Sequence, residues 1–138
     1  MPISARFEKD AGLAIFTHRG VIPDEEFLGT YRTIYRDPRF EKTFNTLVDL
    51  REAESSIRSP EALRTMVNIR DRWLGDLEVN PRVAVVAPAD ISFGLARMYE
   101  AYSDALPFEF IVFKDIGAAL AWLGAPEDLL ENDPTDPD

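Results

Sequence analysis

The feature that most constrains this chain is the apolar run 83–87, which reads VAVVA. The run is too short for a free-standing helix and is rich in β-branched residues, so it predicts a strand buried on both faces. Pro88 ends the run, and Asp90 can cap a new helix by accepting a backbone hydrogen bond one turn on. Apolar residues then follow at helical spacing: Ile91, Leu95, Met98, Tyr99 and Tyr102. The stretch predicts half of a βαβ unit.

Strands and helices are expected to alternate along the rest of the chain. Further strands are predicted at 3–8, 13–19, 46–50 and 108–113, with helices starting near Pro23, Ser59 and Asp115. The first two strands predict an antiparallel hairpin, and the later alternation implies right-handed crossovers. The expected fold class is α/β, in the order β-β-α-β-α-β-α-β-α, with a mixed, mainly parallel five-stranded sheet. The polar segment 51–58 is expected to be a loop.

Three helical positions carry specific expectations. Ser59 precedes Pro60 and is expected to cap its helix, because serine accepts a backbone hydrogen bond and proline suits the first turn. Arg70 lies on an apolar helical face, so its stem should pack while its head reaches water or a carboxylate. Gly94 lies within a helix, and we favour close packing on a strand over the approach of a ligand.

Length and composition bound the class of protein. The 138 residues suit one domain, expected at 1–124, followed by an acidic and partly disordered tail at 125–138. The lack of cysteine excludes disulfides and thiolate metal sites. No apolar run reaches the length of about 18 residues that a membrane span needs, and the first residues do not resemble a signal peptide. A cytoplasmic location without a membrane span is therefore expected.

The charge pattern argues against a nucleic-acid partner. The formal net charge is −10, and the tail after Gly124 holds acids and no basic residue. The 15 basic residues are scattered along the chain and form no basic stripe.

Few residues offer catalytic chemistry. His18 is the single histidine and lies on the second predicted strand, on the face shared with Ala14 and Phe16. A Ser-His-Asp triad would need this residue, and no spacing typical of metal ligands accompanies it. Glycine-rich phosphate loops are absent from the sequence. We therefore expect a packed or edge histidine, no metal and no cofactor, with a hydrolase built on carboxylates as the enzymatic alternative.

One set of charged residues is a candidate site. Asp49 and Arg51 end the third predicted strand, while Asp90 and Arg97 belong to the central βα unit. All four can meet at the loop end of the sheet, where α/β proteins bind ligands. They would hold an anion, perform acid–base chemistry, or form a structural ion-pair cluster. We expect Arg97 to reach Asp49, with Phe93 on the same helical face either sealing the loops or serving as a docking residue.

Several segments in this order resemble the STAS-like domains, which are similar to bacterial anti-sigma-factor antagonists, and in particular a small stand-alone bacterial group of them. The matching segments lie between residues 3 and 123: 20–26 (GVIPDEE), 48–51 (VDLR), 82–88 (RVAVVAP), 93–99 (FGLARMY), 112–115 (VFKD) and 121–123 (AWL). The resemblance implies a mixed sheet with helices and no reaction. It implies partner docking switched by phosphorylation where the third strand meets the second helix, which here offers Ser55, Ser56 and Ser59.

The sequence therefore predicts a non-enzymatic regulatory or protein-interaction domain with a protein partner of unknown identity. The alternative is a small-ligand or lipid carrier similar to the CRAL-TRIO-like branch of the same superfamily. A homodimer is also expected, because the N-terminal hairpin leaves a sheet edge guarded only by Arg6, Glu8 and Lys9. Trp122 falls off the inward stripe of the last helix and is expected to add an exposed aromatic patch.

Overall fold

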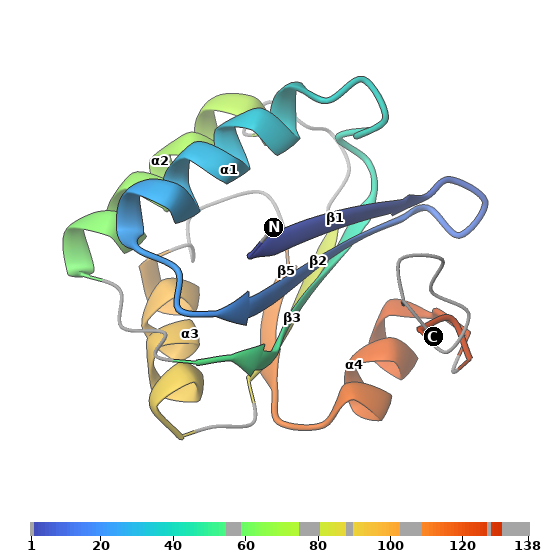
Figure 1. Ribbon diagram of the computed structural model, residues 1–138. Helices are drawn as coiled ribbons and strands as arrows, with labels where there is room; N and C mark the ends of the chain where they lie inside the picture. The colour runs from blue at the N-terminus through green and yellow to red at the C-terminus, as the bar shows by residue number, and fades with distance from the viewer. Residues whose placement is uncertain are drawn as a thin grey trace.

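The computed structural model describes residues 2–54, 59–74, 81–87, 90–102, 109–126 and 128–130. A five-stranded sheet lies between α1, α2 and α3 on one face and α4 on the other (Figure 1). The elements in chain order are β1 (Ile3–Glu8), β2 (Leu13–Gly20), α1 (Asp24–Arg36), β3 (Asn45–Ala53), α2 (Pro60–Leu74), β4 (Arg82–Val86), α3 (Asp90–Tyr102), β5 (Glu109–Phe113) and α4 (Ile116–Leu123). This order confirms the predicted fold class.

The strands follow one another across the sheet in the order β1-β2-β3-β4-β5. β1 and β2 form the predicted antiparallel hairpin, and each later neighbour pair is parallel. A parallel neighbour requires the chain to return to the starting end of the sheet, and α1, α2 and α3 provide these returns. The carboxyl ends of β2, β3, β4 and β5 therefore lie along one end of the sheet.

Alternate residues of each strand divide between two apolar layers. In β4, Val85 belongs to the layer beneath α1, α2 and α3, whereas Val86 belongs to the layer beneath α4. Every residue of the run 83–87 is buried, as the prediction of a strand covered on both faces requires. The helix α4 closes the second layer with Ala119, Leu120 and Leu123.

Side-chain caps begin two of the helices as the sequence predicts. The Ser59 hydroxyl accepts a hydrogen bond from the Ala62 N–H at 3.0 Å, and Pro60 is the first residue of α2. The Asp115 carboxylate accepts from the Ala118 N–H at 3.0 Å at the start of α4. Each cap satisfies one backbone donor that the first helical turn leaves open.

The buried side of α3 agrees only in part with the predicted apolar stripe, because Tyr99 is buried as expected whereas Met98 is exposed. Phe93 packs against the core, Ala96 and Tyr99 are buried, and Met98 is 38% exposed. The Tyr99 ring lies 5.0 Å from that of Phe110 in β5, so aromatic packing selects this side of the helix over the Met98 side.

The expectation that Gly94 allows close packing is wrong. A methyl group at Gly94 would meet no atom within 4 Å, and the residue is exposed. The rotation of α3 that buries Ala96 and Tyr99 leaves Gly94 facing away from the sheet.

The start of the segment 125–138 lies on the α4 side of the sheet. Leu129 and Leu130 pack against the apolar layer there, and Arg6 donates to the Leu129 carbonyl at 3.1 Å. Trp122 is half-buried rather than exposed, because its ring lies 5.8 Å from that of Phe113 and beneath the Arg82 guanidinium. The prediction of an exposed aromatic patch at Trp122 is therefore wrong.

Within the described ranges, no helix combines the length and apolar character that crossing a bilayer requires.

Candidate functional site

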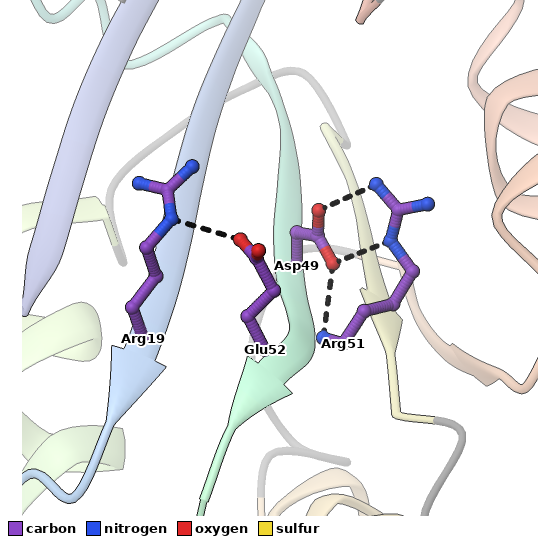
Figure 2. Close-up of polar contacts among 4 residues, drawn as sticks. All are labelled: Arg19, Asp49, Arg51 and Glu52. Carbon is purple, nitrogen blue, oxygen red and sulfur yellow. Dashed lines mark hydrogen bonds and ion pairs between the residues drawn. The ribbon is translucent and has the colours of Figure 1, made fainter. Parts of the chain in front are cut away.

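At the carboxyl end of β3, the buried side chain of an aspartate accepts hydrogen bonds from an arginine of the same strand. Arg51 donates to Asp49 Oδ1 through its backbone N–H at 3.0 Å and its Nε at 2.9 Å, and to Oδ2 through Nη2 at 2.9 Å (Figure 2). The Asp49 side chain is 8% exposed and that of Arg51 is 42% exposed. This bidentate contact compensates the negative charge of Asp49, whose burial without a partner would cost free energy.

A second ion pair lies beside the first. Arg19 at the end of β2 donates through Nε to Glu52 of β3 at 2.8 Å, and both side chains are largely exposed (Figure 2). The parallel register pairs Thr17 with Asp49 but Arg19 with Glu52, so β3 carries one extra residue between these pairs. This irregularity places Glu52 opposite Arg19. An exposed pair of this kind contributes at most about 1 kcal/mol to stability, so it shapes the surface more than it holds the fold.

Arg19 and Glu52 are not among the predicted site residues, because β3 extends beyond the predicted end of the third strand. The strand β3 continues through Ala53, so residues 51–53 belong to the sheet and not to the predicted loop 51–58. Their polar character suggests a loop, but pairing of Glu52 and Ala53 with the end of β2 keeps them in the sheet. The register shift depends on both strands together, and no local sequence signal reports it.

The four charged side chains have an apolar neighbour. Val21 follows β2 directly and is 61% exposed, and the Gly20 carbonyl before it accepts from the Glu54 N–H at 2.8 Å. The hydrogen bond to Asp49 raises the pKa of the Arg51 guanidinium above its ordinary value, while partial burial opposes this. We define the carboxyl-end patch as Arg19, Val21, Asp49, Arg51 and Glu52.

Asp49 and Arg51 are the predicted site residues that the structure brings together. The expected contact between Asp49 and Arg97 is wrong: Arg97 is 63% exposed and pairs with Glu100 one turn further along α3, at 3.5 Å. Phe93 is half-buried beneath the Lys114 ammonium, which lies 4.9 Å from its ring centre, so it seals the core rather than standing open. Asp90 is the first residue of α3, and its side chain lies outside the described part of the structure.

Of the three candidate serines, only Ser59 is described. Its hydroxyl caps α2, and its backbone N–H donates to the Asp24 carboxylate at 3.4 Å. A phosphate on Ser59 would therefore meet a neighbouring negative charge. Ser55 and Ser56 lie outside the described residues.

A separate polar cluster lies inside the core beneath α1, α2 and α3. His18 Nε2 and the Tyr31 hydroxyl are joined by a hydrogen bond of 2.7 Å, and both residues are buried. The prediction of a packed histidine is therefore confirmed, on the face shared with Phe16. The Tyr35 ring lies 6.1 Å from that of Tyr31, and Tyr99 belongs to the same buried layer.

Arg70 is buried within this cluster, so the prediction that its head reaches water or a carboxylate is wrong. The side chain is buried among tyrosines, and its guanidinium lies 5.9 Å from the centre of the Tyr35 ring. Burial lowers the pKa of Arg70, but the surrounding tyrosines outweigh this and raise the pKa overall, so Arg70 keeps its charge. Burial raises the pKa of the Tyr35 phenol, and Arg70 offsets only part of this rise, so Tyr35 stays neutral.

The histidine and the carboxylates of the carboxyl-end patch are held by their neighbours. In the described part of the chain, no three His, Cys, Asp or Glu side chains gather in a group that could hold a metal ion. The histidine directly precedes Arg19, but its side chain points into the core beneath α1, α2 and α3, where it is bonded to Tyr31. Within that patch each carboxylate is already held by an arginine through charge-assisted hydrogen bonds.

Comparison with known proteins identifies the fold. The chain is similar to the crystal structure of an uncharacterized protein from the DUF3478 family with a SpoIIAA-like fold from Shewanella loihica PV-4. The TM-score is 0.56 at 18% sequence identity, and the match covers 88% of this chain and 91% of the other. The chain therefore has a SpoIIAA-like α/β fold, in agreement with the STAS-like resemblance. No family model and no curated protein matches the sequence.

Proposed function

We propose that this chain is a non-enzymatic regulatory or protein-interaction domain that binds a protein partner through the carboxyl-end patch. The observation that carries the proposal is the placement of two ion pairs, Arg19–Glu52 and Asp49–Arg51, at one strand end, with the exposed Val21 two residues after Arg19. Apolar contact area bordered by oriented charges is the usual composition of a specific protein interface. The cysteine-free composition suits a reducing compartment such as the cytoplasm.

The Asp49–Arg51 pair suits a docking role because it is rigid. The carboxylate is buried and fixed by three hydrogen bonds, while the guanidinium remains 42% exposed at the surface. An arginine already held in one orientation loses less conformational freedom on binding. A carboxylate of the partner is the natural acceptor for the remaining donors of Arg51.

Regulation by a serine is the second part of the proposal. Ser55 and Ser56 are the second and third residues after β3 in the sequence, close along the chain to Arg51 and Glu52. A phosphate on either serine would add negative charge beside the docking residues and change which partner charges they attract. Ser59 is a weaker candidate because Asp24 lies beside it.

The test is crosslinking of the full chain in cells, followed by mass spectrometry. Arg19→Glu reverses one charge of the patch, and Arg72→Glu reverses an equally exposed arginine on α2 as the matched control. We expect Arg19→Glu to reduce crosslinks to a specific partner by about tenfold, since a reversed charge at an interface opposes binding. Arg72→Glu should leave them unchanged.

Three results would overturn the proposal. The first is a reproducible turnover that Asp49→Asn abolishes, which would make the patch an active site. The second is an apolar molecule that co-purifies with the chain in native mass spectrometry, which would favour the small-ligand or lipid carrier. Loss of partner crosslinks in both charge variants would likewise show that the patch is not the docking surface.

A further inference from the structure

The outer edge of β1 presents backbone groups that β2 does not use. The Pro2 carbonyl accepts a hydrogen bond from the Arg19 N–H at 2.7 Å, and the register pairs Ile3 with His18. In an antiparallel ladder, alternate residues direct both backbone groups to the same neighbour. The N–H and C=O groups of Ile3, Ala5 and Phe7 therefore point away from β2, along the edge of the sheet.

An open groove runs beside this edge. It has a volume of about 570 Å³ and lies between β1, which contributes Ile3 and Ala5, and α1, which contributes Gly29 and Thr33. Figure 1 shows β1 at the edge of the sheet with α1 alongside it. The small side chains on α1 leave room for the inward-facing side chains of an added strand.

The charged residues of β1 do not protect the groove. Arg6 and Glu8 form an ion pair with each other, and Arg6 also donates to the Leu129 carbonyl on the α4 side of the sheet. The β1 residues that belong to the apolar layer on the groove side are Ile3, Ala5 and Phe7. Native sheets protect their edges with charges or proline, or cover them, because an unguarded edge pairs with another strand.

We infer that this edge binds the same edge of a second copy of the chain, antiparallel and centred on Ala5. A two-fold axis at Ala5 places Ile3 opposite Phe7 of the second copy and uses the outward backbone groups of all three residues on both copies. Such an interface uses the same patch twice, as symmetric dimers do. The two sheets would then form one continuous sheet.

The charges at the two ends of the groove favour a second copy over an unrelated peptide. Arg39 marks one end, because its guanidinium lies 4.9 Å from the Phe7 ring, and Asp37 fixes its orientation. Glu26 marks the other end, because it neighbours Phe27, which contacts His18 opposite Ile3. The antiparallel arrangement places Arg39 of each copy near Glu26 of the other, so the groove is complementary to itself.

Sedimentation equilibrium of the full chain at high micromolar concentration tests this inference. We expect the wild-type chain to sediment at twice the mass of the chain. Ala5→Pro removes an outward N–H and no bond to β2, so it should yield a monomer. Thr33→Trp fills the groove from an exposed helical position and should also yield a monomer.

The matched control is Thr65→Trp on α2. Thr65 donates its hydroxyl to the carbonyl four residues earlier, as Thr33 does on α1, so both substitutions remove the same local bond. Thr65→Trp should remain a dimer. A wild-type monomer at high micromolar concentration, or a Thr33→Trp chain that stays a dimer, would overturn the inference. The inference is independent of the carboxyl-end patch, because Arg19→Glu is expected to leave the mass unchanged.

Discussion

Arg51 holds the Asp49 carboxylate from two residues further along the same strand, with its backbone N–H and its guanidinium together. The contact needs no other element of the fold. Asp49 is therefore satisfied before α3 approaches, and Arg97 is left to pair with Glu100 on its own helix. The carboxyl-end patch depends on the end of β3 and its register with β2, not on the central helix.

The first prediction separates these two arginines. Arg51→Met should lower the free energy of unfolding by about 1–3 kcal/mol, because it leaves a buried carboxylate without its charged donor. Arg97→Met removes an exposed charge and should change the stability by less than about 0.5 kcal/mol. Denaturant midpoints of the two variants measure the difference. A lowered midpoint for Arg97→Met with an unchanged one for Arg51→Met would return the structural role to Arg97.

The second prediction concerns the stability of the fold at acidic pH. The Arg39 hydrogen bonds lower the pKa of Asp37 from its ordinary value of 3.8 to about 2. A lowered pKa means that the pair stabilises the fold at pH values above the ordinary pKa of the carboxyl group. This contribution disappears as the pH falls through about 2. A carboxyl-carbon NMR titration should find the Asp37 midpoint near 2. In Arg39→Met the midpoint should rise towards the ordinary value, and an unshifted midpoint would contradict the pairing.

The sequence predicts those parts of the fold that depend on local chemistry. Ser59 and Asp115 cap their helices because a side-chain oxygen one turn before a backbone N–H needs no tertiary information. The run 83–87 is buried as a strand because its composition permits little else. The Asp49–Arg51 pair is equally local, since both residues belong to one strand end, although the predicted partner of Asp49 is Arg97.

The parts that the sequence does not predict depend on how elements meet. The α3 helix carries overlapping apolar stripes, and contact of Tyr99 with Phe110 selects between them. Arg19 meets Glu52 only through an irregular register between two strands. Arg70 is buried because tyrosines from other elements surround it, which the periodicity of α2 cannot show.

The third prediction uses the rotation of α3. Gly94→Ala should raise the stability by about 0.5–1 kcal/mol, because alanine favours a helix and its methyl group would enter open space. Gly124→Ala is the contrasting variant, since Gly124 ends α4 with a φ of 72° that strains any residue with a Cβ. It should lower the stability by about 1 kcal/mol. Thermal midpoints of both variants provide the comparison, and a destabilised Gly94→Ala would indicate that α3 packs closely at that position.

The fourth prediction distinguishes two neighbouring tyrosines on α1. The Tyr31 hydroxyl is bonded to His18 Nε2, whereas the Tyr35 hydroxyl is buried with no hydrogen-bond partner among the described residues. Tyr31→Phe should therefore lower the free energy of unfolding by about 1–3 kcal/mol, since it leaves a buried ring nitrogen without that bond.

Tyr35→Phe removes a buried hydroxyl that forms no hydrogen bond with the described residues, and it keeps the ring beside Arg70. It should leave the stability unchanged or raise it by up to about 1 kcal/mol, because an unsatisfied buried polar group costs free energy. Both variants change one oxygen atom on the same helix, so each is the control for the other. Denaturant unfolding at neutral pH compares them under conditions where Tyr35 is neutral. An equal loss of stability in both variants would show that the Tyr35 hydroxyl is hydrogen-bonded in solution and that Arg70 and its tyrosines form one connected network.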